Sequence, residues 1–579
     1  MAAAMAMGLG GGWPLNVFCT PDLEPFYAVT YLPEKAMLQL LQRIDHLWRT
    51  ERPMLIAQGR QVVDALSKAN LPGGAGEFSM TEAELARVVG KELGIVDPEW
   101  GGILGRAKFP TPARWHFLLH LWRRNGDDRA RGMVEKTLEN MASGALFDQI
   151  GGGFHRYCID RDWRTPHFEK MLYDNALLAA LYTEAAVALD RPDFGEVAAR
   201  TLDFMIDQMQ LQQGGFASSI DAESEQGEGV FYAWTPQQVL DLAGSEDGEV
   251  LLRHLGLEAG GAFGGGAIPT RRNGGGNEAS EVFRKWRPAL LAERQKRPRP
   301  PLDEKVITAW NGMAIVALVA GYRAFRDDRY LDAALKANLY LANTHSLDGG
   351  AVARASNDGL PSGTGALEDY AWWAEAQIEL FQATGDVRHS RGALELAASA
   401  VERFSEGDGG FRTYEAEGLS GAGNLAVSDM PTPSAVSVMA HLALDLYELT
   451  ADSRWLERAR KLLGRYQPLM ERGGLDLAWM YDAALFHLAG KSLAVVAGTP
   501  EQRRHFIGQL AARLYPQLIL AQVPAGGAHR DIAGLLPALS EKRAKGKSAQ
   551  AFLCTGVTCT AATSDPAELE AKITRGWRH

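Results

Sequence analysis

The sequence predicts a mostly α-helical protein built from consecutive helix pairs, with a short α/β segment on either side of the helical region. Two observations predict this class. Apolar residues recur at three- and four-residue steps from about Thr111 to about Gly490. In the same region, Gly-Gly followed by Phe or a small apolar residue occurs repeatedly, as punctuation between helices would.

Composition narrows the class of protein. The chain has 579 residues, of which 46% are hydrophobic and 23% charged, values that are ordinary for globular proteins. The net charge of −11 is spread along the chain, and the short basic runs carry a single aromatic, Trp286, which argues against a nucleic-acid partner. No run of about 18 uncharged apolar residues suggests a membrane span. The four cysteines are too few for a disulfide scaffold, so we expect a reducing, cytoplasmic location.

The N-terminal segment is predicted to begin with a β-hairpin. Residues 15–20 and 26–31 read as strands separated by a Pro- and Asp-containing turn, and helices are expected over 34–49 and 55–69. Two strands do not form a stable domain alone. The hairpin must therefore lean on its own helices or on the larger helical body.

The helical region carries apolar stripes that predict its main helices. They cover 195–211, 306–325, 330–343, 368–384, 390–404, 433–449 and 454–469. The Gly-Gly motifs begin at positions 152, 214, 349 and 409. The first and last gaps are about 60 residues, a length that suits two helices and a loop. The middle gap is about twice as long, as if one copy were missing or disguised. Such pairs can close into a ring or remain an open solenoid, and the period alone does not decide between them.

The chain changes character after about Lys491. An apolar run over 492–498 ends at a glycine, a helical pattern follows over 501–514, and two further strand-like stretches lie at 518–523 and 549–560. This order predicts a small α/β unit at the C-terminal end.

Several long motifs resemble one known family. They include GGWPLNVF at 11–18, FDQIGGGFHRY at 147–157, PHFEKMLYDNA at 166–176 and FYAWT at 231–235. These runs are similar to the spermatogenesis-associated, thioredoxin domain-containing family. The resemblance implies a thioredoxin-like domain followed by an (α/α)₆ barrel of the six-hairpin glycosidase kind. It divides the chain into a partial thioredoxin-like segment (1–105), the barrel (106–490) and the C-terminal α/β region (491–579).

The cysteines depart from the redox pattern of thioredoxin-like proteins. No C-x-x-C motif occurs in the chain, so we expect no dithiol exchange by that segment. Cys554 and Cys559 either form a redox pair or are two small apolar residues on neighbouring strands. A zinc site is disfavoured because a second pair of Cys or His at suitable spacing is missing. The sequence therefore predicts neither a metal nor another cofactor.

Candidate chemical groups concentrate in the stretch 148–174. Sugar hydrolysis and epimerisation need paired proton-transfer groups across a pocket. The predicted catalytic residues are Asp148, His155, His167, Glu169, Asp174, Asp221, Glu223 and Asp369. Predicted substrate-binding residues are Arg156, Tyr157, Trp163, Tyr173, Trp234, Trp310 and Asn311. Because this stretch leads into a helix of the predicted ring, we expect many of these side chains to meet at one mouth of the ring.

Each candidate also has a structural interpretation. His167 follows a proline at a helix start and can be a cap or packing group, and Asp369 can cap its own helix. Asp221 and Glu223 can belong to a solvated loop, and Trp310 can be a core residue. The hypothesis favoured here is a carbohydrate-active or carbohydrate-binding barrel, glycosidase-like or epimerase-like if it is an enzyme. The rival hypotheses are a thioredoxin-family redox or chaperone protein and a catalytically inactive interaction scaffold.

Overall fold

The fold is taken from a computed structural model of the whole chain. The structure describes residues 2–9, 14–69, 76–271, 276–407, 409–415, 427–524, 532, 535–544, 548–556 and 558–577. Part of the GGWPLNVF motif, Gly11 to Trp13, lies outside these residues. Within them, no helix is long and apolar enough to span a membrane.

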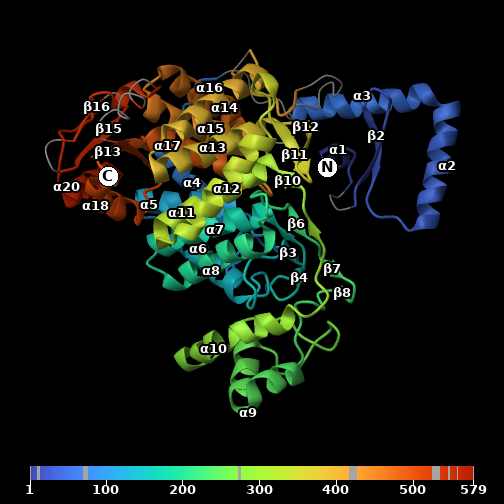
Figure 1. Cartoon of the computed structure of the whole chain (residues 1–579). Coiled ribbons are helices and arrows are strands. Elements are labelled where there is room, and N and C mark those ends of the chain that lie inside the picture. The colour runs from blue at the N-terminus through green and yellow to red at the C-terminus, as the bar shows by residue number, and fades with distance from the viewer. Residues whose placement is uncertain are drawn as a thin grey trace.

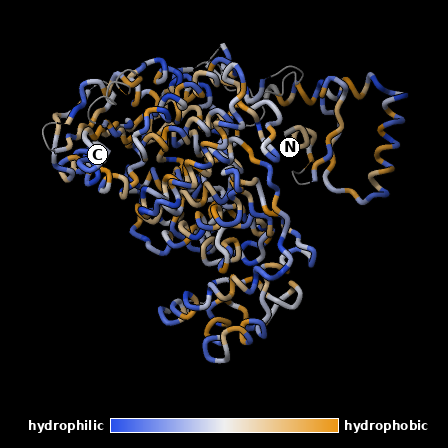
Figure 2. Tube along the Cα trace, in the orientation of Figure 1, coloured by the Kyte–Doolittle hydropathy of each residue, from blue (hydrophilic) through white to orange (hydrophobic). Residues whose placement is uncertain are grey.

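The centre of the molecule is a closed ring of inner helices, which Figure 1 shows from the side. They are α5 (Pro112–Asn125), α7 (Leu172–Ala188), α11 (Thr308–Phe325), α13 (Leu367–Thr384), α15 (Ala435–Thr450) and α17 (Ala478–Ala489). Each packs on the next, and α17 packs back on α5. The molecule is therefore an (α/α)₆ barrel and not an open solenoid. Figure 2 shows hydrophobic stretches running through this ring, where one continuous apolar core forms.

An outer layer of helices surrounds the ring. It contains α6 (Asp128–Ser143), α8 (Pro192–Phe204), α12 (Asp328–Thr344), α14 (Val387–Phe404) and α16 (Ser453–Gly473), each directly after its inner partner in the chain. The inner helix α17 is instead joined by α4 (Glu82–Glu92), which comes from far upstream in the sequence and packs on it. One hairpin of the barrel is therefore assembled from the two ends of the helical region, and α4 lies inside the segment 1–105.

The Gly-Gly-Phe motif is fixed to the inner helix that follows it. Asn175 on α7 accepts a hydrogen bond from the backbone N–H of Phe154 (2.6 Å) and donates one to its carbonyl oxygen (3.1 Å). Asn311 on α11 makes the same two bonds with Phe216 (2.7 and 3.1 Å). Glycine is required before Phe154 because a Cβ on Gly153, at φ +74°, would lie 2.3 Å from the ring of Phe204.

An inserted lobe accounts for the long middle gap between Gly-Gly motifs. Helices α9 (Pro236–Leu255) and α10 (Gly276–Arg294) pack on each other below the ring in Figure 1. They have a separate apolar core that includes Leu251, Leu255 and Phe283. The expectation of a missing or disguised repeat is therefore wrong: the extra residues form a lobe outside the ring.

Short strands line the loops around the ring. They are β3 (Tyr157–Cys158), β4 (Pro166–His167), β5 (Lys170–Met171), β6 (Ser219–Ile220), β7 (Glu223–Ser224), β8 (Gly227–Glu228), β9 (Leu302–Asp303), β10 (Val306–Ile307), β11 (Ala353–Asn357) and β12 (Leu360–Thr364). A short π-helix, η1 (Met205–Met209), directly follows α8. In the described residues, β3 pairs with β4, and β5, β6 and β9 form one small sheet. These pairs hold the loops in place where the chain enters α7 and α11.

The N-terminal segment projects away from the ring (Figure 1). It consists of α1 (Ala2–Ala6), β1 (Asn16–Cys19), β2 (Pro25–Val29), α2 (Glu34–Thr50) and α3 (Arg52–Ala69). Strand β2 packs on α3 and α1, and Phe26 stacks on Trp48 of α2 with ring centroids 6.2 Å apart. The hairpin was expected to pack either on its own helices or on the larger helical body. The contacts show that it packs on its own helices.

The C-terminal unit caps the carboxyl-terminal end of the ring. Its elements are β13 (Ser492–Gly498), α18 (Pro500–Ala511), β14 (Leu518–Pro524), β15 (Gln550–Thr555), β16 (Thr558–Cys559) and α20 (Pro566–Trp577), and the sheet order is β14-β13-β15-β16. The α13 side chain of Gln382 accepts a hydrogen bond from the backbone N–H of Leu520 (2.9 Å). Gln522 donates to the carbonyl oxygen of Gln382 (2.9 Å). These contacts join the sheet to the end of α13.

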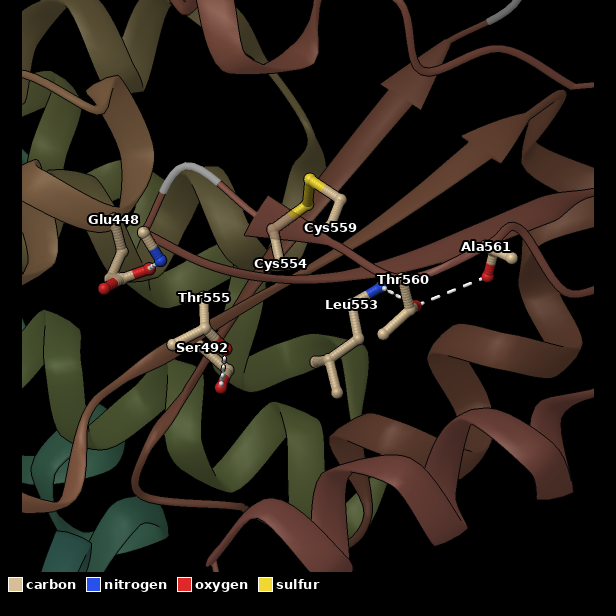
Figure 3. The surroundings of a disulfide bond; sticks show 9 residues. Glu448, Ser492, Leu553, Cys554, Thr555, Cys559, Thr560 and Ala561 are labelled. Carbon is tan, nitrogen blue, oxygen red and sulfur yellow. Dashed lines mark hydrogen bonds between the residues drawn. A yellow bond between two sulfur atoms is a disulfide. The ribbon is translucent and has the colours of Figure 1, made fainter.

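Cys554 and Cys559 are joined by a disulfide bond (Figure 3). They face each other on β15 and β16, with Cα atoms 4.0 Å apart. The interpretation as two unbonded apolar residues is therefore wrong. Sequence alone did not decide this, because the pairing depends on the tight turn that brings the two strands into register.

Candidate functional site

A cavity of about 200 Å³ lies inside the ring, between the middle and the carboxyl-terminal ends of the inner helices. Every inner helix contributes side chains at three- and four-residue steps, because this spacing places residues on one helix face. The polar and aromatic lining residues are His116, His120, Glu184, Arg323, Trp372, Glu375, Glu379, Gln382, His441, Asp445, Trp479, Asp482, Phe486, Lys491 and Tyr515. We call this cavity the lumen site.

His120 lies between two carboxylates. Its Nδ1 is 2.8 Å from Asp482 on α17, and its Nε2 is 3.0 Å from Glu184 on α7. Burial alone would lower the pKa of His120, but the two carboxylates raise it to about 10. The imidazolium in turn lowers the pKa of Glu184 to about 2, against the effect of burial. His120 is therefore a charged group that holds three inner helices together.

His441 has the opposite state. Its Nε2 is 3.0 Å from the carbonyl oxygen of Trp479, so the proton must be on Nε2 and the Nδ1 lone pair is left to accept. Burial lowers the pKa of His441 to about 4. At neutral pH this residue is an uncharged imidazole, the state that a general base needs.

Glu375 is a carboxyl group in the same lumen, and its pKa is shifted in the opposite direction to that of His441. It is enclosed by the lumen walls, and burial, followed by the charge of Asp445, raises its pKa well above the usual value. Its Oε1 atom has no hydrogen-bond partner among the described residues. Asp445 is itself ion-paired with Lys491. The lumen thus contains a carboxyl group whose protonated form is favoured by burial and an imidazole kept neutral, which is the division of roles seen between a general acid and a general base.

Two tryptophans form part of the lumen wall. Trp372 and Trp479 lie with ring centroids 6.3 Å apart, and His441 packs against Trp479 at 5.0 Å. His116 also packs against Trp479, at 5.5 Å. Flat aromatic faces beside polar groups are typical of pockets that bind small molecules with both apolar and hydroxylated faces.

Three lumen residues have the geometry of metal ligands. His116, His120 and Glu184 each offer one atom, and these atoms lie within 4.8 Å of one another. Two histidines one helical turn apart with a carboxylate are a donor set that suits zinc. The same groups are already ion-paired with Arg123 and Asp482. A metal would have to displace the proton between His120 and Glu184.

Two predicted catalytic residues lie in the wall of the barrel. Asp148 is buried and ion-paired with both Lys170 (2.8 Å) and Arg294 (2.8 Å). Its Oδ1 also accepts a hydrogen bond from the backbone N–H of Gly151 (2.9 Å). The Nδ1 atom of His155 is 3.0 Å from the carbonyl oxygen of Phe168. Burial lowers the pKa of His155 to about 3, so it is a neutral packing residue at physiological pH.

Four other predicted residues line one open pocket of about 580 Å³ beside the loops: His167, Glu169, Asp221 and Glu223. The Nδ1 atom of His167 is 3.0 Å from Glu228, and Glu169 is ion-paired with Arg156 at 2.7 Å. Tyr157 faces His167 across the β3–β4 pair. The structure therefore brings this part of the predicted site together, at the surface and apart from the lumen site.

Asp174 lies near these residues but is buried. Burial raises its pKa well above the usual value, with Arg156 opposing and Glu169 adding to the rise. Its Oδ2 atom has no hydrogen-bond partner among the described residues. Its neighbour Tyr173 contacts Trp310 edge to face, with centroids 4.8 Å apart. Tyr173, Asp174 and Trp310 thus lie together where α7 and α11 begin.

The remaining candidates have structural contacts. Asp369 accepts hydrogen bonds from the backbone N–H groups of Ala309 and Ala366 and pairs with Arg354. Trp163 is buried and donates to the carbonyl oxygen of Trp100. Trp234 belongs to the core of the α9–α10 lobe. Asn311 is the residue that fixes the second Gly-Gly-Phe motif.

The lumen residues were missed because each inner helix contributes only a few of them, from one on α7 to four on α13. A signal was present in the sequence. His116 and His120 lie one turn apart on a predicted helix, on a different face from Trp115 and Trp122. A polar pair on the second face of a helix in a closed ring indicates a polar lumen.

Comparisons with known proteins place the chain among named relatives. Residues 1–67 match a thioredoxin-type family model, Thioredox_DsbH, described as a protein of unknown function, DUF255. Human spermatogenesis-associated protein 20 is 30% identical, with 98% of this chain and 80% of the human protein covered. An uncharacterized protein of Caenorhabditis elegans is 25% identical over 98% of this chain and 84% of its own length.

Solved structures of similar fold are distant in sequence. A cellobiose 2-epimerase from Spirochaeta thermophila has a TM-score of 0.46 at 14% identity, with 70% of this chain and 94% of that chain covered. A family 76 α-mannanase from Bacteroides thetaiotaomicron has a TM-score of 0.42 at 12% identity, with 69% and 95% covered.

Proposed function

The chain belongs to the family of spermatogenesis-associated protein 20, and we propose that its lumen site binds a carbohydrate or sugar-like molecule and transfers protons to and from it. The observation that carries the proposal is that one tryptophan-walled cavity is lined both by a carboxyl of raised pKa, Glu375, and by a neutral imidazole, His441. Both hydrolysis and epimerisation of sugars need such a pair.

The roles follow from the contacts. His441 is the general base, because its Nε2 proton is held by a backbone carbonyl and its Nδ1 is the accepting atom. Glu375 is the general acid, because burial raises its pKa and so favours the protonated carboxyl. The charged group His120 is a positioning residue that fixes α5 between α7 and α17. Trp372 and Trp479 provide the faces on which a sugar ring packs.

The surface pocket around His167 and Glu169 is proposed to contribute to ligand binding only, without a part in proton transfer. Its groups, with Asp221 and Glu223, are proposed contacts for parts of a ligand outside the lumen. The buried residues Asp148, His155 and Asp369 are not given a chemical role, because hydrogen bonds and ion pairs already occupy them.

Binding is tested with a panel of mono- and disaccharides and the Trp479→Leu variant. A ligand that binds only the folded state raises the melting temperature by mass action. At least one sugar is expected to do so for the unmodified protein, and Trp479→Leu should weaken its affinity at least tenfold. Trp455→Leu, in the outer helix α16, is the matched control and should leave the affinity unchanged. If no sugar in the panel binds, or if both variants behave alike, the proposal is wrong.

A further inference from the structure

A second cavity, of about 270 Å³, lies where the α9–α10 lobe meets the ring. One wall is the end of α8 with η1, the second is α10, and the third is the loop region around Gly151 and Tyr232. None of its lining residues lines the lumen site. We call this cavity the junction pocket.

The junction pocket is rich in positive charge. Its cationic lining residues are Lys170, Arg200, Arg287, Arg294 and Arg299. Its carboxylates are Asp203 and Asp207, and Asp203 already binds Arg329 and the hydroxyl of Tyr330. Behind the wall, Asp148 pairs with both Lys170 and Arg294, so that one negative charge faces two positive charges. Among the described residues, neither Arg287 nor Arg299 forms an ion pair, so positive charge remains without a counter-charge.

Two of these arginines are buried with unused donors. Arg200 is 7% exposed, and Arg294 is 5% exposed. The Nε and Nη1 atoms of Arg200 and the Nε atom of Arg294 have no hydrogen-bond partner among the described residues. The nearest carboxylate to Arg200 is Glu196, 3.6 Å from Nη1, and its side chain is half exposed. A buried charged donor without a partner costs free energy, so an acceptor is expected at this place.

The arginines also act on one another. Burial, followed by the positive charges of Arg287 and Arg271, lowers the pKa of Arg200 to about 9. Burial is the largest cause of this shift, Arg287 and Arg271 add to it, and Glu196 and Asp148 oppose it. The position of Arg200 is nevertheless well fixed, because its Nη2 donates to the carbonyl oxygens of Asp148 and Gln149, and its guanidinium lies 4.9 Å from the Phe147 ring centroid.

We propose that the junction pocket is a binding site for an oxyanion, either a phosphate group or a carboxylate group of a small molecule. Guanidinium groups bind such anions through parallel N–H donors, and three donor atoms of Arg200 and Arg294 are buried without a hydrogen-bond partner among the described residues. Arg287 and Arg299 complete the charge at the less buried side. Because the anion would contact both α8 of the ring and α10 of the lobe, it would hold the lobe against the ring.

The experiment is a titration of the full chain with inorganic phosphate and, separately, with succinate, followed by calorimetry at constant ionic strength in sodium chloride. The variants are Arg287→Gln and Arg299→Gln, which leave the buried bonds of Arg200 and Arg294 in place. Arg388→Gln is the control, because Arg388 is exposed and pairs only with Asp386 among the described residues.

We expect saturable binding of at least one anion, weakened at least tenfold by each pocket variant and unchanged by the control. Tighter binding of phosphate assigns a phosphate group as the ligand, and tighter binding of succinate assigns a carboxylate. Failure of both anions to bind, or equal weakening by Arg388→Gln, overturns the proposal. The test is independent of the sugar panel, because Trp479→Leu should leave anion binding unchanged.

Discussion

At the scale of single residues, Asn175 and Asn311 show how a repeated motif becomes a repeated joint. Each side chain satisfies both the N–H and the carbonyl oxygen of the phenylalanine that follows a glycine pair. The glycines allow the turn, and the asparagine joins it to the next inner helix. The Gly-Gly-Phe pattern is therefore a connector between hairpins, which is why it recurs at the hairpin spacing.

The first prediction concerns the free energy of unfolding of Asn175→Ala. Removal of the amide leaves the buried N–H and carbonyl of Phe154 without partners, so the free energy of unfolding should fall by about 3 kcal/mol. Denaturant titration measures it. Asn140→Ala is the control, since its side chain makes a single bond at the protein surface and should cost less than about 0.5 kcal/mol. If the two variants lose the same free energy of unfolding, Asn175 does not fix the Gly-Gly-Phe motif to α7 in the way described.

The second prediction concerns the pH dependence that His120 gives to stability. Its pKa is raised from 6.5 to about 10 on folding, so its contribution is fully present below pH 6.5 and is lost as the pH rises towards 10. The difference in free energy of unfolding between the unmodified protein and His120→Gln should therefore shrink between pH 6.5 and pH 9.5. His46→Gln, at an exposed residue of α2, is the control for the exchange of histidine for glutamine itself. If the difference in free energy of unfolding for His120→Gln stays constant over this pH range, His120 is not held in its charged form by Asp482 and Glu184.

Some features of the candidate site could be predicted from the sequence, and others could not. The density of ionisable groups in 148–174 was visible in the sequence, and His167 and Glu169 do meet in one pocket. Ion pairs were not visible: Asp148 is paired with Arg294, which is 146 positions away. The lumen pair His120 and Asp482 is separated by 362 positions, so no local pattern could join them.

At the scale of elements, the apolar stripes predicted most helices closely. The stripe 368–384 became α13 (Leu367–Thr384), and the strand expected over 492–498 is β13 (Ser492–Gly498). Helix α4 was not assigned to the ring, because its partner α17 follows it by almost the whole barrel. Pairing between distant elements depends on closure of the ring, and the period of a sequence carries no information on closure.

The third prediction concerns the disulfide between β15 and β16. The two cysteines are separated by five positions, so the bond closes a short loop and should contribute about 2 kcal/mol to the free energy of unfolding. The double variant Cys554→Ser/Cys559→Ser should lose this amount. A reducing agent should destabilise the unmodified protein by the same amount and leave the double variant unaffected. An effect of the reducing agent on the double variant would show that another thiol is responsible.

The fourth prediction concerns deletion of residues 1–75. The N-terminal elements pack mainly on one another, and side chains such as Met5, Leu38 and Met54 are exposed on them. The truncated chain should keep the melting temperature of the barrel within about 2 °C, because it loses few contacts with the ring. It should also bind less of an apolar dye such as ANS. A large fall in melting temperature would show that the segment supports the barrel.

At the scale of the whole molecule, the barrel is closed by parts that are far apart in the chain. Helix α4 completes the hairpin of α17, and the C-terminal sheet covers the carboxyl-terminal ends of α13 and α15. Glu448 of α15 accepts a hydrogen bond from the backbone N–H of Gly556, in the turn between the disulfide-linked strands (Figure 3). Helices from every hairpin surround the lumen site, and Leu518 and Ile519 of the C-terminal sheet also line it.

The central claim is that proton transfer takes place in the lumen and not at the surface pocket. Proton NMR in D₂O tests it most directly, with the sugar that gives the largest thermal shift. The spectrum reports both deuterium entering a C–H position and new anomeric signals from hydrolysis. We expect one of these changes with the unmodified protein and with His167→Gln, and a rate at least a hundredfold lower with His441→Gln. Full activity of His441→Gln together with its loss in His167→Gln would place the chemistry at the surface pocket and contradict this account.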